Sequence, residues 1–256
     1  MNVTLNNLLN LISPLTMFDA AALALILLSW LVMAQIIENR AATRPSVSVL
    51  MISYRREWMR NTITRDPRVY DAMVIASLRE STAFFASATM IAIGGCLALM
   101  GNVDQLTGLA AELSIEDSPP VLWEIKLLLP LFFVTNAFLH FVWSHRVFGY
   151  CSIVMASVSN DVHHPAATHR ADQAADLNIS AAKAFNRGLR SVYFSLGALA
   201  WLLGSFPLLV ATVTTVLVLW RREFASATRA TLMRDPPARP TSEAMRRVAA
   251  DHNLPE

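Results

Sequence analysis

The chain has 256 residues, of which 54% are hydrophobic and 16% are charged, and its formal net charge is +2. Soluble domains carry about 25% charged residues, so this composition excludes an ordinary soluble domain and is typical of a membrane protein. The small net charge gives no support to nucleic-acid binding. Long apolar runs separated by amphipathic stretches predict an all-α integral membrane bundle. No segment shows a strand pattern that would favour a β architecture instead.

The first apolar run covers residues 18–37 without interruption. About 20 apolar residues are enough for a helix to cross the hydrocarbon core, so this run predicts the first span. Residues 1–16 contain no Lys or Arg, and no small-residue cleavage site follows the run. We therefore expect the first span to be retained rather than removed as a signal peptide, with residues 1–16 as a short outer segment.

A basic amphipathic segment follows the first span. Its apolar and arginine residues lie on opposite faces of a helix, with Leu50, Met51, Tyr54 and Trp58 on one face and Arg55, Arg56 and Arg60 on the other. This pattern predicts a helix that lies against lipid headgroups or packs against its neighbours. Asp66 and Pro67 then resemble an N-cap and the first residue of a helix that leads into the second span.

Residues 82–100 and 121–145 are the next two apolar runs and predict the second and third spans. The third carries Glu124 and Lys126 near one end, where a long side chain can reach the membrane boundary. These two residues are candidates for an outer mouth.

Basic residues gather in three blocks, at 40–79, 146–190 and 221–256, which hold all of the 21 Lys and Arg residues except Lys126. The connection 101–120 has no basic residue and carries Asp and Glu instead. Lys and Arg concentrate on the cytoplasmic side of membrane proteins. We therefore expect the three blocks to lie inside and the connection to lie outside.

The last apolar run is broken at Gly204-Ser205-Phe206-Pro207. By itself it predicts either one over-long helix or two short ones, but the charge pattern requires two crossings with a tight outer turn at the break. We therefore expect about five spans in an inner (plasma) membrane, with the N-terminus outside and the C-terminus cytoplasmic. Long cytoplasmic helical extensions are expected before the second and fourth spans. The predicted spans are residues 18–37, 82–100, 121–145, 187–203 and 206–221.

These spans belong to one transmembrane helical domain, residues 17–222. The remaining residues, 223–256, form a polar cytoplasmic tail in which three prolines oppose regular structure. A short helix is predicted in this tail near residues 243–250.

Four stretches of the chain resemble one known family. They read "WMRNTITRDPRVYDA" from Trp58, "TAFFASATMIAIGGCLALMG" from Thr82, "NAFLHFVWSHRVFGY" from Asn136 and "NRGLRSVYFSLGALAWLLG" from Asn186. Together they are similar to the bacterial and plant membrane family called domain of unknown function 599, over roughly residues 18–220. The resemblance implies a membrane bundle, but it does not point to any particular activity. It also implies an aromatic residue and a lysine where Asn136 and His140 stand here.

The third span carries a polar stripe, Asn136, His140 and Ser144, whose spacing of four residues places the side chains on one helical face. Two interpretations remain open. The stripe can hydrogen-bond to a neighbouring helix. Alternatively, it can line a path for ions or protons, in which a titratable group at position 140 adds anion preference.

Charged residues at the inner ends of the spans predict an ion-pair network at the inner interface. Its members are Arg79, Glu80, Arg146, Arg187 and Arg190. Glu80 is the natural partner for one of the arginines, so its loss is expected to weaken folding.

Metal and cofactor sites are not expected. The cytoplasmic segment with Asp161, His163, His164, His169 and Asp172 has suitable ligand types, but their spacing matches no zinc pattern. Cys96 and Cys151 fall toward opposite ends of the bundle, beyond the reach of a disulfide. The sequence also lacks nucleotide-binding and catalytic motifs.

Two functional classes remain. The first is a non-catalytic structural or accessory subunit that contacts lipid and packs against other membrane subunits or copies of itself, supported by the small residues Ser87, Gly94, Gly95 and Gly197. The alternative is an oligomeric ion channel or transporter whose third span lines the path. We prefer the first class, because the only Gly-Pro break lies at the outer surface rather than at mid-membrane.

Overall fold

The computed structural model describes residues 16–103, 108 and 120–234, and these residues form helices without any strand. The predicted all-α fold is therefore confirmed. The α-helices are α2 (Met17–Glu38), α3 (Val47–Asn61), α4 (Val69–Met100), α6 (Pro120–Ala156), α7 (Ala167–Ala198), α8 (Ser205–Phe224) and α9 (Ala227–Leu232), and two 3₁₀ turns are η1 (Thr62–Thr64) and η2 (Leu199–Leu203).

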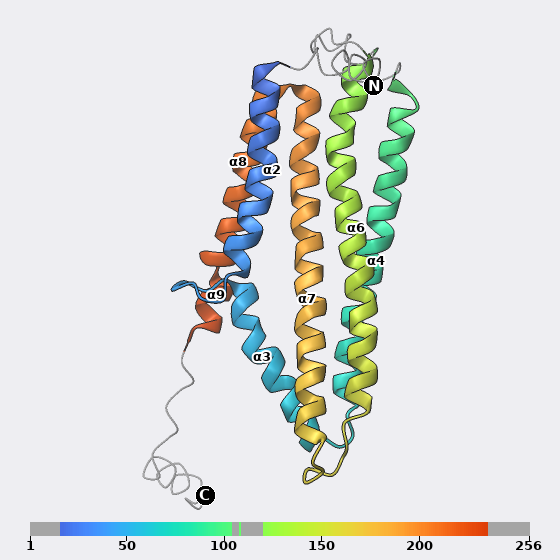
Figure 1. Cartoon of the computed structure of the whole chain (residues 1–256), viewed down its shortest axis with the longest axis vertical. Helices are drawn as coiled ribbons and strands as arrows, with labels where there is room; N and C mark the ends of the chain where they lie inside the picture. Colours follow the sequence, from blue (N-terminus) through green and yellow to red (C-terminus); the bar gives the residue numbers. More distant parts are fainter. Residues whose placement is uncertain (1–15, 104–107, 109–119, 235–256) are drawn as a thin grey trace, which may run out of the picture.

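The helices form an elongated bundle around α7 (Figure 1). α2 and α8 pack together on one side of α7, and α6 packs on its other side with α4 beyond it. α2 and α8 occupy only the upper half of the view in Figure 1, whereas α4, α6 and α7 run through both halves. α3 turns away from the end of α2 and packs along the lower half of α7.

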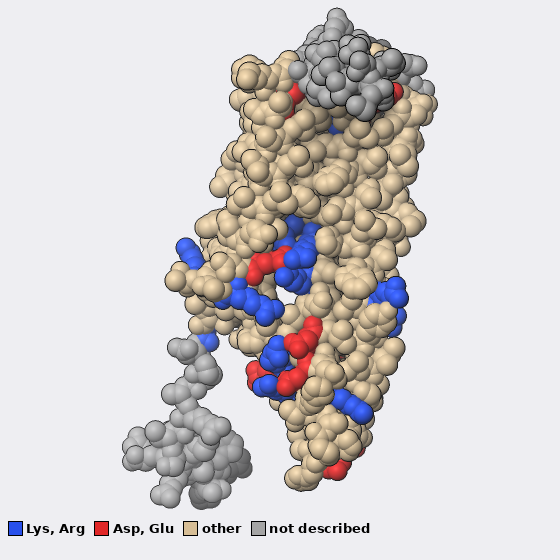
Figure 2. All heavy atoms as spheres, viewed as in Figure 1, with Lys and Arg blue, Asp and Glu red and all other residues tan. Residues whose placement is uncertain are grey.

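Charged side chains separate the two halves (Figure 2). On the face shown, Lys, Arg, Asp and Glu are concentrated in the lower half, and the upper half is nearly free of them. Each half has its own apolar core. Ile26, Phe133, Phe194 and Trp201 are central to the upper core, and Met59, Ile75, Cys151 and Met155 to the lower one.

In the described part of the chain, three helices are long and apolar enough to cross a membrane, namely α2, α4 and α6. The predicted spans at 187–203 and 206–221 correspond to the end of α7 with η2 and to α8, which are not among these three. The polar residues Ser191 and Ser195 of α7 are buried against neighbouring helices, whereas Leu196 is 62% exposed. A central helix can therefore be less apolar than a peripheral one.

The chain reverses direction between η2 and α8 at Gly204, which has φ of 117°. This backbone conformation favours glycine because it has no Cβ. Pro207 lies in the first turn of α8, where an amide hydrogen would have no partner within the helix. The tight turn predicted at this break is present.

The start of α4 differs from the prediction. α4 begins at Val69 with Arg68 as its N-cap residue, not at Pro67. The Arg68 guanidinium donates to the carbonyl oxygens of Val158 and Ser159, at 2.6 and 2.9 Å. These contacts join the start of α4 to the α6–α7 connection, and the sequence could not show them.

α3 packs against α7 through its arginine face as well as through Trp58 of the predicted apolar face, which lies against the core that contains Ala174 and Ala175. Arg56 and Arg60 pair with Asp176 and Asp172 on α7, at 2.7 and 2.8 Å. The hydrogen bond from Arg60 lowers the pKa of the Asp172 carboxyl. Tyr54, on the predicted apolar face, remains 45% exposed. Acidic residues on α7 give these arginines partners on the side that α3 covers.

The closest helix contact at a glycine occurs at Gly188 of α7, not at the glycine pair of α4. A Cβ built on Gly188 would lie 2.6 Å from Cε1 of Phe141 on α6, whereas Gly94 and Gly95 have nothing within 4 Å. The Phe141 ring is fully buried, and its centroid lies 5.4 Å from those of both Phe85 and Phe185. The ring therefore has little room to move aside.

We expect Gly188→Ala to destabilise the bundle by about 1–3 kcal/mol, because an added methyl overpacks the α6–α7 contact. The measurement is the thermal unfolding midpoint of the purified protein in detergent. Gly149→Ala on α6 is the matched control, because a Cβ there would meet nothing within 4 Å and alanine should leave stability unchanged or raise it slightly. An unchanged midpoint for Gly188→Ala would contradict the tight contact.

Candidate functional site

The polar stripe of α6 faces α7, and two of its three members bond to that helix. Ser191 donates to Oδ1 of Asn136 at 2.9 Å, and Ser144 donates to the carbonyl oxygen of Ala181 at 2.8 Å. Ser144 is completely buried. His140 is half-buried, within electrostatic range of Glu38 and two arginines of α7. The contacts of Asn136 and Ser144 match the hydrogen-bonding interpretation of the stripe.

The charged residues predicted as one inner network lie in two separate groups. Arg187 and Arg190 reach Glu38 at the end of α2, where Lys183 also binds at 2.8 Å. Nε and NH2 of Arg187 donate to the two carboxylate oxygens of Glu38 at 2.8 and 2.6 Å. Three cations of α7 therefore share one carboxylate, and this carboxylate is Glu38 rather than the expected Glu80.

The second group lies between α4 and α6. Nδ1 of His145 is 3.2 Å from the carbonyl oxygen of Arg79, and Arg146 donates to the hydroxyl of Tyr150. Glu80 is exposed, and within the described residues no ion pair of this side chain occurs. The prediction that Glu80 pairs with an arginine is not met, because Lys183, Arg187 and Arg190 project toward α2.

The two candidates for an outer mouth have different environments. Glu124 is exposed, whereas Lys126 is 2% exposed with its Nζ 5.5 Å from the ring centroid of Trp123. Glu124 is therefore open to the surroundings, whereas Lys126 is enclosed within the bundle.

The histidine-containing segment near the start of α7 is exposed. Asp161 and His163 form a local turn, with the amide of His163 donating to Oδ1 of Asp161 at 2.9 Å, and Asp172 is paired with Arg60. In the ranges that the structure covers, no group of three or more His, Cys, Asp or Glu side chains could hold a metal ion. Cys96 and Cys151 are both free thiols.

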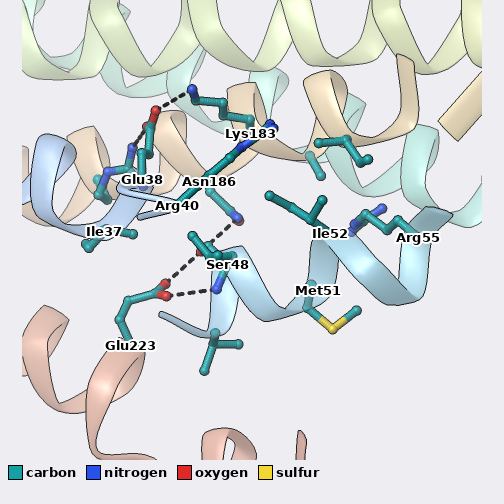
Figure 3. A pocket seen from close by; sticks show the side chains of 15 residues that line it. Ile37, Glu38, Arg40, Ser48, Met51, Ile52, Arg55, Lys183, Asn186 and Glu223 are labelled. Carbon is teal, nitrogen blue, oxygen red and sulfur yellow. Dashed lines mark hydrogen bonds and ion pairs between the residues drawn. The ribbon is translucent and has the colours of Figure 1, made fainter. Parts of the chain in front are cut away.

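A cavity of about 250 Å³ lies where the ends of α2 and α8 meet α3 and α7 (Figure 3). It is located at the border between the charge-poor upper half and the charged lower half, where Figure 2 shows a hollow surrounded by basic and acidic side chains. Four basic and two acidic side chains line it, namely Arg40, Arg55, Lys183, Arg190, Glu38 and Glu223.

A hydrogen-bonded chain across the cavity joins three helices (Figure 3). Asn186 of α7 donates to Oγ of Ser48 on α3 at 3.3 Å. The amide and hydroxyl of Ser48 each donate to Glu223 of α8, both at 3.1 Å. Glu223 is thus held by neutral donors, and Glu38 is held by cations from α7.

Arg55 lies at the other end of the cavity, and its hydrogen-bond partner there is neutral. Its guanidinium donates to Oδ1 of Asn178 on α7. Burial lowers the pKa of Arg55, but a guanidinium remains protonated in proteins. The arrangement of the cavity can therefore hold a negatively charged group.

A family model described as "Protein of unknown function, DUF599" matches residues 21–228. The chain belongs to the DUF599 family. The family assignment expected from the four sequence stretches is therefore confirmed, and the matched region includes every residue that lines the cavity. No curated protein and no solved structure matches the chain significantly.

In this DUF599 chain, sequence reasoning missed the cavity and the role of Glu38. One signal for Glu38 was present, because Lys183, Arg187 and Arg190 are spaced to share one face of α7 and require an acidic partner at the same depth. The hydrogen bonds between Ser48 and Glu223 could not be predicted from local sequence, because the two residues are 175 positions apart.

Proposed function

We propose that this chain is a five-span protein of the inner (plasma) membrane, with its N-terminus outside and its C-terminus in the cytoplasm. Two observations support this topology. α2, α4, α6, α7 and α8 all pass through the charge-poor upper half, and the lower half carries the basic blocks that the positive-inside rule assigns to the cytoplasm. α8 has 20 residues, which span about 30 Å as a helix.

We propose further that the protein is a non-catalytic structural or accessory subunit, packed against other membrane subunits or copies of itself. The observation that carries this proposal is the use of polar groups inside the bundle. Asn136, Ser144 and Ser195 all take part in hydrogen bonds between α6 and α7, which lock the two helices together instead of lining a path. Interhelical hydrogen bonds of this kind contribute roughly 0.6 kcal/mol each.

α4 offers the surface on which such a partner would pack. Its span is only 6% buried within the chain, compared with 44% for that of α6. Gly94 and Gly95 have open space where a Cβ would stand. A helix that carries small residues on an uncovered face allows close approach of another transmembrane helix.

Native mass spectrometry of complexes extracted gently from the source membrane tests the proposal. We expect stoichiometric co-purification with other membrane proteins or a defined homo-oligomer, and a bulky substitution at Gly94, Gly94→Leu, should release the partner. Ser87→Leu serves as a second variant nearby on α4, and Leu139→Ala on the exposed face of α6 as a control. A chain that stays monomeric throughout would contradict the proposal.

The alternative function, an oligomeric channel or transporter, makes a different prediction. Purified protein in a planar bilayer would conduct, and His140→Ala would change the pH dependence of the conductance, because the variant removes a titratable side chain from the path. We expect no conductance over the accessible voltages for either the original chain or the variant. A reproducible conductance that His140→Ala alters would favour the channel.

A further inference from the structure

The cavity between α2, α3, α7 and α8 contains more positive charge than its own carboxylates neutralise. Two more basic than acidic side chains line it, and Arg187 adds a further cation at its edge through Glu38. Arg40 is exposed and has no ion pair in the described ranges of the chain. Lys183, Arg187 and Arg190 share the Glu38 carboxylate, whereas Arg40 and Arg55 pair with no carboxylate in the described ranges.

Arg55 has no acidic partner on α7, because the nearby acidic residues of that helix pair with other arginines. Asp172 and Asp176 lie on the α7 face that α3 covers, but they bind Arg60 and Arg56. The partner left for Arg55 is the amide of Asn178. One Asn178 oxygen accepts from a guanidinium that has five donors, so Arg55 retains donors for an anion.

The walls of the cavity are amphipathic. Val49, Met51, Ile52 and Ile179 line it together with the charged side chains. Its volume of about 250 Å³ has room for roughly eight water molecules, at about 30 Å³ each. A phosphate group with a few attached carbons fits this space, and its apolar part would face the aliphatic walls.

We propose that this cavity binds a phosphate-bearing anion, with Arg55 and Arg40 as its principal cationic contacts. Guanidinium groups form planar, paired hydrogen bonds with phosphate oxygens, which makes arginine well suited to this ligand. The phosphate comes either from the headgroup of an anionic phospholipid or from a soluble phosphate compound. The lipid source depends on the membrane placement proposed above, whereas anion binding does not.

The test measures ligand binding to the purified full-length chain in neutral detergent. Phosphatidylglycerol and phosphatidylcholine are titrated separately and bound lipid is counted by native mass spectrometry; glycerol 3-phosphate and inorganic phosphate are titrated in parallel by calorimetry. We expect saturable binding of a phosphate-bearing anion that phosphatidylcholine, whose headgroup is zwitterionic, does not reproduce. Saturation by phosphatidylglycerol alone assigns a lipid, and saturation by glycerol 3-phosphate or phosphate assigns a soluble ligand.

Variants connect the binding to the cavity. Arg55→Gln and Arg40→Gln should each weaken binding about tenfold or more, because hydrogen bonds to charged groups contribute at least this factor. Arg56→Gln is the matched control, since it removes the same charge from the neighbouring position of α3. In the original chain Arg56 pairs with Asp176 and does not line the cavity. The affinity of Arg56→Gln should change less than about twofold.

Arg40→Gln also protects the test against misfolding, because Arg40 is exposed and its replacement should leave the thermal midpoint unchanged. Absence of saturable binding to any of the anions would overturn the proposal. So would equal losses in Arg40→Gln, Arg55→Gln and Arg56→Gln, which would show general attraction by surface charge. These readouts are independent of subunit composition, so they can fail without affecting the proposed function.

Discussion

Glu38→Gln is expected to destabilise the protein strongly, because Glu38 is the shared partner of three cations. The substitution leaves Lys183, Arg187 and Arg190 without the carboxylate that they share, and Arg190 is only 5% exposed. Removing one partner of a buried ion pair costs about 3–5 kcal/mol, because the other charge remains buried and uncompensated. The thermal unfolding midpoint, followed by tryptophan fluorescence in detergent, should fall by roughly 6–20 °C.

Glu80→Gln is the matched control for this experiment. Glu80 also stands at the end of a basic segment that leads into an apolar run, but it is exposed, so its replacement should change stability by no more than about 0.5 kcal/mol. Adding Arg190→Gln to Glu38→Gln should recover part of the loss, since it removes the buried uncompensated charge. A larger effect from Glu80→Gln than from Glu38→Gln would contradict the assignment.

Asp19→Ala is expected to give the second large effect, at the opposite end of the bundle. Asp19 is 6% exposed, and its carboxylate accepts hydrogen bonds from Trp201 at 2.8 Å and Ser205 at 2.5 Å. It also accepts from the amide of Thr16, within the capping box of α2. This carboxylate therefore joins the start of α2 to η2 and α8.

Alanine at position 19 leaves the indole N–H of Trp201 buried without its partner. We expect a loss of about 2–4 kcal/mol in the free energy of unfolding, because hydrogen bonds to a charged group contribute about 1.5–3 kcal/mol each and are not fully additive. Glu124→Ala is the control, since it removes an exposed carboxylate on α6. If both variants unfold at the midpoint of the original chain, the proposed role of Asp19 is wrong.

Much of the helix content could be predicted from local sequence. The apolar run 18–37 and the glycine break at Gly204 have local causes, namely the length of chain needed for a span and the freedom of glycine at positive φ. Arg68 shows where such reasoning ends. Its guanidinium binds backbone carbonyls about 90 residues away and joins the start of α4 to the α6–α7 connection.

The pairing of charged residues required knowledge of the packing. The basic face formed by Lys183, Arg187 and Arg190 predicts an acidic partner. Glu38 and Glu80 are both candidates, because each stands at the end of an apolar run. α2 lies beside the basic face of α7, and this arrangement selects Glu38. The glycines follow the same logic, since Gly188 faces Phe141 whereas Gly94 and Gly95 face outward from the bundle.

The sequence by itself determined that this protein is a helical bundle of the DUF599 family with apolar helices long enough to cross a membrane, because span length, hydropathy and family motifs are local properties. Only the tertiary structure decided that Glu38 collects the cations of α7 and that a basic cavity forms between four helices. Ser48 and Glu223 come from positions 175 residues apart. Their contact exists because helix packing brings α3 and α8 together, and no local pattern encodes that proximity.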